Sequence, residues 1–194
     1  DTCLDLQLLV TGSHLSHEFG YTVDEIKNDG FPITREIEML IASDTPKSIS
    51  KSTGIAMISF ADTFFELQPD LVVLLGDRFE IFAVATSAYL AQIPIAHLMG
   101  GEITQGALDD AIRHSITKMS WWHFVATEEY KKRVMQLGED SSRIFVTGGM
   151  GVDIIQKIKL LEKSVLEENL KCRFGEKNLL ITYHPETLGA ESSK

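Results

Sequence analysis

The sequence LVVLLGDRFE, residues 71–80, joins an apolar run to a glycine, an acid and an arginine. Five consecutive apolar residues that end at Gly76 predict a strand buried on both faces, as in a parallel sheet. Ligands of open α/β sheets bind just beyond the carboxyl ends of the strands, where Asp77 and Arg78 follow. A carboxylate beside a guanidinium suits an anionic substrate that undergoes proton transfer. An aspartate at a strand end also caps helices in inactive proteins, but an arginine in the first helical turn is unfavourable unless an anion lies near it. We therefore expect chemistry at this edge of the sheet.

Along the rest of the chain, short apolar runs alternate with amphipathic stretches, which is typical of βα units around a Rossmann-like parallel sheet. The predicted fold class is α/β. Strands are expected over 6–10, 71–75, 93–97, 123–126, 144–146 and 179–183, and helices over 45–67, 78–91, 109–120, 127–137 and 151–170, the last with a possible break. The longest helix has Thr45 as its cap and Pro46 in its first turn. Its expected apolar face consists of Ile49, Ile55, Ile58, Phe60 and Phe64.

The composition is that of an ordinary globular protein, with 194 residues of which 44% are hydrophobic and 24% are charged. A net charge of −10 argues against nucleic acid or anionic lipid as a partner, because phosphate backbones are bound by basic surfaces. Cys3 and Cys172 follow no zinc or redox spacing, which is typical of reduced thiols. The sequence shows no signal peptide and no apolar run of the roughly 18 residues that a membrane span requires. The protein is therefore expected in the cytoplasm.

A second group of candidates, HLMGGE at residues 97–102, ends another predicted strand. The pair Gly100 and Gly101 would let the backbone approach a ligand closely, and Glu102 would then face the same sheet edge as Asp77. A plain turn with a solvated glutamate explains the same residues. His97 fits a buried core histidine as well as a base.

A third group, DDAIRHSITK at residues 109–118, begins a predicted helix whose positive end favours Asp109 and Asp110. Helical spacing places Asp109 with Arg113 on one side and Asp110 with His114 on another. A solvated, salt-bridged face explains this pattern. Carboxylates beside a histidine or an arginine also form an acid/base set whose pKa values can be tuned.

Two further histidines are weaker candidates: His14 in a Gly-Ser-His turn and His184 in a Tyr-His-Pro segment after the last predicted strand. Either residue alone is explained by a surface position. The sequence contains no nucleophile elbow, Walker loop or spacing of metal ligands. No bound metal is therefore predicted.

Five segments together resemble the hydrolysing UDP-N-acetylglucosamine 2-epimerases, which begin the synthesis of sialic-acid and legionaminic-acid-type sugars. They are GSHL (12–15), GDRFE (76–80), GGE (100–102), DDAIRHSITK (109–118) and TYHP (182–185). The resemblance runs through nearly the whole chain, and its specific parts are GDRF and DDxIRH. It implies a glycosyltransferase-B-type fold with two Rossmann-like lobes. Residues 1–176 would form the N-terminal lobe, lacking its first strand unit, and residues 177–194 the opening strand of the second, UDP-binding lobe.

The reaction implied by the resemblance is anti elimination of UDP to give a 2-acetamidoglucal, followed by addition of water. The substrate would be UDP-N-acetylglucosamine or a 2,4-diacetamido-6-deoxy analogue, and no metal or redox cofactor is implied. Moving a proton at C2 needs a base and an acid, and the departing diphosphate needs a cation. Asp77 and Asp109 match the family's acidic catalytic positions, and Arg78 matches an arginine that binds UDP. His14 and His184 match histidines that reach the substrate region.

The sequence departs from the family pattern at Met99, where many members have a catalytic glutamate. A methionine cannot transfer a proton, so Glu102 is the candidate replacement. The loop before Asp109 is one residue longer, and the family's arginine-containing amino-terminal loop and most of the second lobe are absent. This segment alone is therefore expected to be inactive. The resemblance also implies a homodimer, and the remaining substrate-binding candidates are Gly100, Gly101, Arg113 and His114.

Three other interpretations remain open. A non-hydrolysing epimerase would return UDP to the glycal, and a retaining glycosyltransferase of the same architecture would need an acceptor. A nucleotide-sugar-binding module without catalysis is the third, and Met99 is the residue that motivates it.

Overall fold

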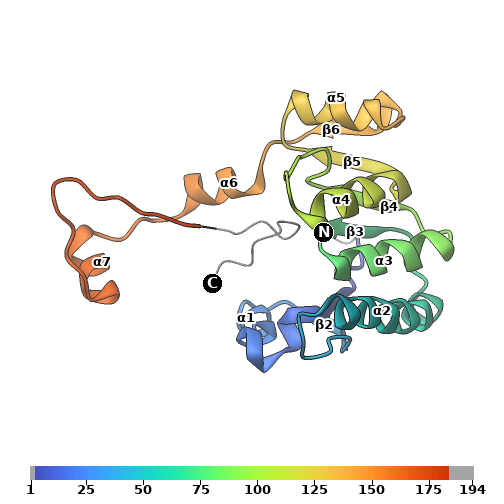
Figure 1. Ribbon diagram of the computed structural model, residues 1–194, viewed down its shortest axis with the longest axis horizontal. Helices are drawn as coiled ribbons and strands as arrows, with labels where there is room; N and C mark the ends of the chain where they lie inside the picture. Colours follow the sequence, from blue (N-terminus) through green and yellow to red (C-terminus); the bar gives the residue numbers. More distant parts are fainter. Residues whose placement is uncertain (1–2, 184–194) are drawn as a thin grey trace.

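The computed structural model describes residues 3–183 and contains two parallel β-sheets flanked by helices (Figure 1). The larger sheet has the strand order β3-β4-β5-β6, and a smaller sheet pairs β1 with β2. The strands are β1 (Leu8–Thr11), β2 (Ile33–Ile37), β3 (Val72–Leu75), β4 (Ile95–Leu98), β5 (Trp122–Val125) and β6 (Ile144–Val146). Every pairing is parallel, so the predicted α/β class is confirmed.

Three helices, α2 (Pro46–Leu67), α3 (Phe79–Leu90) and α4 (Leu108–Met119), pack next to one another against the strands (Figure 1). Ile37 of β2, Leu74 of β3 and Phe60 of α2 belong to the same buried cluster. One core therefore holds both sheets and fixes the strand ends that carry the candidate site. The other helices are α1 (Val23–Asn28), α5 (Glu128–Gln136), α6 (Met150–Lys157) and α7 (Lys163–Leu170), and short 3₁₀ turns cover Gly12–Leu15, His17–Phe19 and Ser141–Arg143.

Helix α2 begins where the sequence predicts. The hydroxyl of Thr45 accepts a hydrogen bond from the Ser48 amide at 3.2 Å, and Pro46 stands in the first turn. The predicted apolar face is wrong in part, because Ile55 and Ile58 are 39% and 70% exposed. The buried positions are Ser52, Ala56, Phe60, Thr63 and Phe64. They follow one helical stripe, and this stripe leaves positions 55 and 58 on the outer side.

Strand β3 is not buried on both faces, contrary to the prediction. Leu74 is 6% exposed, whereas Val73 and Leu75 are 61% and 48% exposed. Successive side chains of a strand point to opposite faces. Leu74 points into the core, and the described residues leave the opposite face of this edge strand largely open.

Strand β2 is missing from the sequence prediction. Its residues alternate between partly buried and exposed positions, but an arginine, Arg35, occupies one of the partly buried positions. Arg35 pairs there with Glu66 of α2 at 2.6 Å. A charged residue at this point hides the apolar alternation by which a strand is recognised.

The C-terminal part of the described chain extends away from the sheets as α6 and α7 (Figure 1). The predicted break within 151–170 is confirmed, since α6 ends at Lys157 and α7 begins at Lys163. The strand predicted over 179–183 is wrong for this chain, where Leu180 and Ile181 are 93% and 77% exposed. A strand needs a partner for its backbone groups, and none of the described strands pairs with this segment.

No helix within residues 3–183 has the length and apolarity needed to cross a bilayer. Cys3 and Cys172 are free, exposed thiols.

Candidate active site

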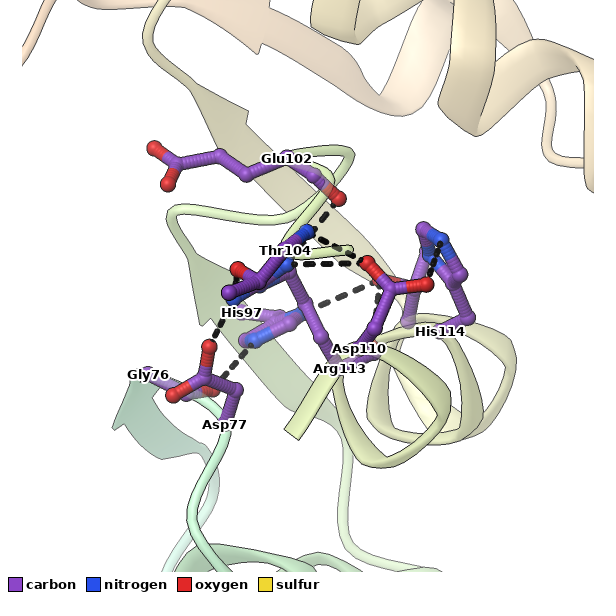
Figure 2. Close-up of polar contacts among 9 residues, drawn as sticks. Gly76, Asp77, His97, Glu102, Thr104, Asp110, Arg113 and His114 are labelled. Carbon is purple, nitrogen blue, oxygen red and sulfur yellow. Dashed lines mark hydrogen bonds and ion pairs between the residues drawn. The ribbon is translucent and has the colours of Figure 1, made fainter. Parts of the chain in front are cut away.

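Two turns and the start of a helix carry the predicted acids at one edge of the larger sheet, and Figure 2 shows Asp77, Glu102 and Asp110 among them. Asp77 follows β3, Glu102 lies in the loop after β4, and Asp109 and Asp110 begin α4. Strands β3 and β4 are paired along their whole length. Their carboxyl ends therefore open at the same place, which is where α/β sheets bind ligands.

Arg113 of α4 ties these turns to one another. Its side chain is 5% exposed, and its guanidinium pairs with the Asp77 carboxylate. The same group donates hydrogen bonds to the carbonyl oxygen of Glu102 at 3.0 Å and to the Thr104 hydroxyl at 2.9 Å. Asp110 Oδ1 lies 3.5 Å from Nη1 of Arg113. These contacts use the guanidinium inside the protein, which favours a positioning role for Arg113 over the predicted contact with substrate.

Asp109 lies within electrostatic reach of Asp77. Burial raises the pKa of the Asp109 carboxyl above its usual value, and the charge of Asp77 raises this pKa further. Arg78 and Arg113 act in the opposite direction without cancelling the increase. A carboxyl group that keeps its proton more readily beside a second carboxylate matches an acid/base pair.

Arg78 is held by Glu80 of α3. Two hydrogen bonds join them, from Nε to Oε2 at 3.1 Å and from Nη2 to Oε1 at 2.9 Å. The Glu80 side chain is 6% exposed, whereas that of Arg78 is 62% exposed. The ion pair therefore orients the guanidinium and leaves most of it open to an anion. Its charge also reaches Asp77 and Asp109.

A cavity of about 450 Å³ opens beside Arg78, and its lining includes Leu15, Met39 and Phe79. Its size is within the range of small-molecule sites. Gly12, directly after β1, also lines it and has a φ of +66°. A Cβ added to Gly12 would lie 3.1 Å from Cγ of Glu80. Glycine at this position therefore lets the β1 turn approach the ion pair of Arg78.

The glycine pair after β4 faces protein atoms. A Cβ added to Gly101 would lie 2.5 Å from the carbonyl oxygen of Tyr130, and one added to Gly100 would lie 3.2 Å from Oγ1 of Thr117. Arg133 of α5 also donates a hydrogen bond to the Gly101 carbonyl. Close packing of this turn against α4 and α5 explains why both positions are glycine. A contact between the glycine pair and a ligand stays a prediction.

The family model described as UDP-N-acetylglucosamine 2-epimerase matches residues 1–194. The chain belongs to this family. It is 47% identical, over its whole length, to the GDP/UDP-N,N'-diacetylbacillosamine 2-epimerase (hydrolyzing) of Campylobacter jejuni, and covers 50% of that protein. It is 39% identical to the UDP-N,N'-diacetylbacillosamine 2-epimerase (hydrolyzing) of Legionella pneumophila, over 98% of the chain and 50% of that protein. The chain spans about half the length of the curated relatives it matches.

Solved epimerase structures share this fold. The UDP-GlcNAc 2-epimerase from Neisseria meningitidis bound to UDP-GlcNAc has a TM-score of 0.70 at 21% identity, over 88% of this chain and 43% of that one. A second UDP-N-acetylglucosamine 2-epimerase has a TM-score of 0.72 at 20% identity, over 85% of this chain and 44% of that one. The chain therefore has the fold of the N-terminal half of a glycosyltransferase-B-type protein, as the sequence predicts.

Other predicted site residues of this chain have structural partners. Asp110 Oδ1 accepts a hydrogen bond from the Thr104 amide at 2.7 Å, which fixes the loop before α4. His114 Nε2 lies 3.8 Å from Asp110 Oδ2. His14 Nδ1 lies 2.8 Å from the Thr22 hydroxyl, in an exposed position. His184 lies outside the described residues.

Glu102 stands apart from the Arg113 cluster. Its backbone carbonyl belongs to the cluster, but its carboxylate extends away from it (Figure 2). Sequence reasoning missed Thr104 and Glu80 as supports of the site. Glu80 follows Arg78 by two residues, and this spacing of opposite charges was the available signal. Within residues 3–183, no cluster of three or more His, Cys, Asp or Glu side chains is arranged to hold a metal ion.

Proposed function

We propose that the complete protein is a hydrolysing 2-epimerase that converts a UDP-N-acetylhexosamine and water into UDP and the free 2-epimer. The observation that carries the proposal is the placement of Asp77 just after β3 and of Asp109 in the first turn of α4, at the sheet edge where the guanidinium of Arg78 is exposed. The names of the Campylobacter and Legionella relatives, both described as hydrolyzing, support it.

In the proposed reaction, Asp77 accepts the C2 proton of the sugar while the bond from C1 to the UDP oxygen breaks. Arg78 stabilises the negative charge of the departing diphosphate. Water then adds its hydroxyl group to C1 of the glycal, and Asp109 gives a proton to the opposite face of C2. The proton that the water loses restores Asp109, and Asp77 releases the C2 proton to solvent. The raised pKa of Asp109 suits this donating step.

The proposed substrate is UDP-N-acetylglucosamine or its 2,4-diacetamido-6-deoxy relative. Two relatives are named for N,N'-diacetylbacillosamine, and a third, 39% identical over 97% of the chain, is the polysialic acid biosynthesis protein P7 of Escherichia coli. We also propose a cytoplasmic homodimer. Exposed apolar side chains on this lobe, Tyr89, Leu90 and Trp121, support a subunit interface.

We further propose that residues 1–176 belong to the first lobe and that residues 177–194 begin the UDP-binding second lobe. The separation of the strands into two sheets supports the proposal that the first lobe is incomplete. Among the described strands, β1 pairs with β2 alone and β3 with β4 alone, so each has an unpaired edge. One more parallel strand between β1 and β3 would join them into a single sheet and satisfy those backbone groups.

The test is incubation of the complete protein with each UDP-N-acetylhexosamine in deuterated water. We expect release of UDP and a free 2-epimer that carries deuterium at C2, because the proton that is returned comes from solvent. Mass spectrometry and proton NMR measure both products. If the nucleotide sugar stays intact and keeps its original C2 hydrogen, the proposal is contradicted. The protein would then be interpreted as a nucleotide-sugar-binding module without catalysis. A UDP-linked 2-epimer would instead show a non-hydrolysing enzyme, and glycosyl transfer without C2 exchange a glycosyltransferase.

Replacing Glu102 by Gln tests whether this residue supplies the acid that Met99 cannot. If Glu102 transfers a proton, Glu102→Gln should lower kcat by about 100-fold, the lower range for a general acid or base. Met99→Leu is the matched control and should retain activity, because neither side chain moves a proton. A Glu102→Gln enzyme with wild-type kcat would exclude Glu102 as an acid or base of the reaction.

A further inference from the structure

His97 lies in β4, next to the turn that carries Asp77 (Figure 2). Its side chain is 0% exposed. Nε2 lies 2.9 Å from the carbonyl oxygen of Gly76, and Nδ1 lies 3.3 Å from the Thr117 hydroxyl on α4. One buried side chain therefore connects the turn of Asp77 with the helix that carries Asp109.

The contact with the Gly76 carbonyl assigns the tautomer of this ring. Burial lowers the pKa of His97 to about 4, so the ring is neutral near pH 7. A neutral imidazole donates from one nitrogen and accepts at the other. The Gly76 carbonyl can only accept, so Nε2 carries the proton. Nδ1 then faces the Thr117 hydroxyl, which also lies 3.0 Å from the carbonyl oxygen of Arg113.

The bond to Gly76 acts directly on the position of Asp77. The Gly76 carbonyl and the Asp77 amide belong to one planar peptide group, so fixing the carbonyl also fixes the plane to which the Asp77 Cα is attached. Gly76 has a φ of +92°, and glycine rotates more freely than other residues. The His97 bond therefore restrains a peptide plane that the glycine itself leaves free to rotate.

We propose that His97 is a positioning residue of the epimerase reaction, holding the Gly76–Asp77 peptide so that the Asp77 carboxylate stays in register with Asp109. The proposal rests on the proposed function of the complete protein. His97 itself does not touch the substrate, since the ring is fully buried and both nitrogens face protein groups. It acts through the geometry of Asp77.

The test compares two replacements in the complete enzyme. His97→Leu removes the donor, and we expect kcat to fall by about 100-fold, the loss that a displacement near 1 Å of a catalytic group can cause. KM should change by less than about threefold, because binding energy shared by substrate and transition state is retained. His97→Gln places an amide NH₂ where Nε2 stands, and it should recover at least a tenth of the wild-type kcat.

His123 provides a matched control for loss of a buried histidine. It is also 0% exposed and is the register partner of His97 on β5. Its Nε2 lies 3.3 Å from Oε2 of Glu139, and no contact among the described residues joins it to Asp77 or Asp109. His123→Gln should lower the melting temperature and leave kcat of the folded enzyme within about threefold of wild type. Wild-type kcat in His97→Leu would overturn the proposal. So would a His97→Gln enzyme no better than His97→Leu, or equal losses of kcat in the His123→Gln control.

Nitrogen-15 NMR of the histidine-labelled complete enzyme provides a readout that does not depend on activity. We expect His97 as the neutral Nε2–H tautomer, and the other tautomer would overturn the proposal. Failure of the proposed function is a separate result, because a wild-type enzyme that releases no UDP and exchanges no C2 proton contradicts that function before any variant is compared.

Discussion

Replacing Asp77 by Asn in the complete protein is expected to lower kcat by about 10³-fold, within the range for loss of a general acid or base. The amide has the shape of the carboxylate but cannot accept the C2 proton. Its neutral oxygen still accepts a hydrogen bond from Arg113, so the fold of the turn should persist. UDP release and C2 deuteration measure the loss, and binding of UDP should change little.

The same variant tests the coupling between the two acids. The Asp77 charge raises the pKa of Asp109, so its removal should lower that pKa toward the usual value. A carbon-13 NMR titration of the Asp109 carboxyl measures this change. Asp140→Asn is the control, because Asp140 caps a distant turn by accepting from the Ser142 amide at 2.9 Å and Asn caps equally well. An Asp77→Asn enzyme that keeps more than a tenth of the wild-type kcat would exclude Asp77 as the base.

Local sequence patterns predicted the elements that carry the site. An apolar run ended by Gly76 placed Asp77 at a strand end, and paired acids placed Asp109 at a helix start. Both positions depend on a few neighbouring residues, whose turn and capping preferences are strong. The same kind of reasoning predicted the cap of α2 at Thr45 and the break after α6.

What the sequence did not predict depends on contacts between distant segments. Helical spacing grouped Arg113 with Asp109, whereas the folded chain pairs it with Asp77, which lies 36 residues away. The glycine pair pointed to a ligand, but the backbone of Tyr130 on α5 explains the need for Gly101. The exposure of Val73 depends on which element covers the sheet, and the apolar run alone contains no information about that.

Replacing Arg113 by Met should destabilise the complete protein by about 3–5 kcal/mol, the usual cost of removing one partner of a buried ion pair. The variant leaves the Asp77 carboxylate without its cation. The Glu102 carbonyl and the Thr104 hydroxyl each lose the hydrogen bond that Arg113 donates. Urea unfolding measures the free energy of unfolding. Arg35→Met is the control, since Arg35 pairs with Glu66 at the surface with side chains 38% and 54% exposed, and such a pair contributes about 1 kcal/mol or less.

The double variant Arg113→Met with Asp77→Asn tests whether the two residues stabilise the protein as a pair. If they act independently, their effects on the free energy of unfolding add. If the Asp77 charge is what makes the loss of Arg113 costly, the double variant should be more stable than the sum of the two single losses by about 1–3 kcal/mol, as expected for groups in direct contact. Additive losses would mean that Arg113 acts through the loop carbonyl and hydroxyl alone. If Arg113→Met unfolds no more readily than Arg35→Met but binds UDP-sugar more weakly, the guanidinium contacts substrate, and the positioning role inferred from its burial is wrong.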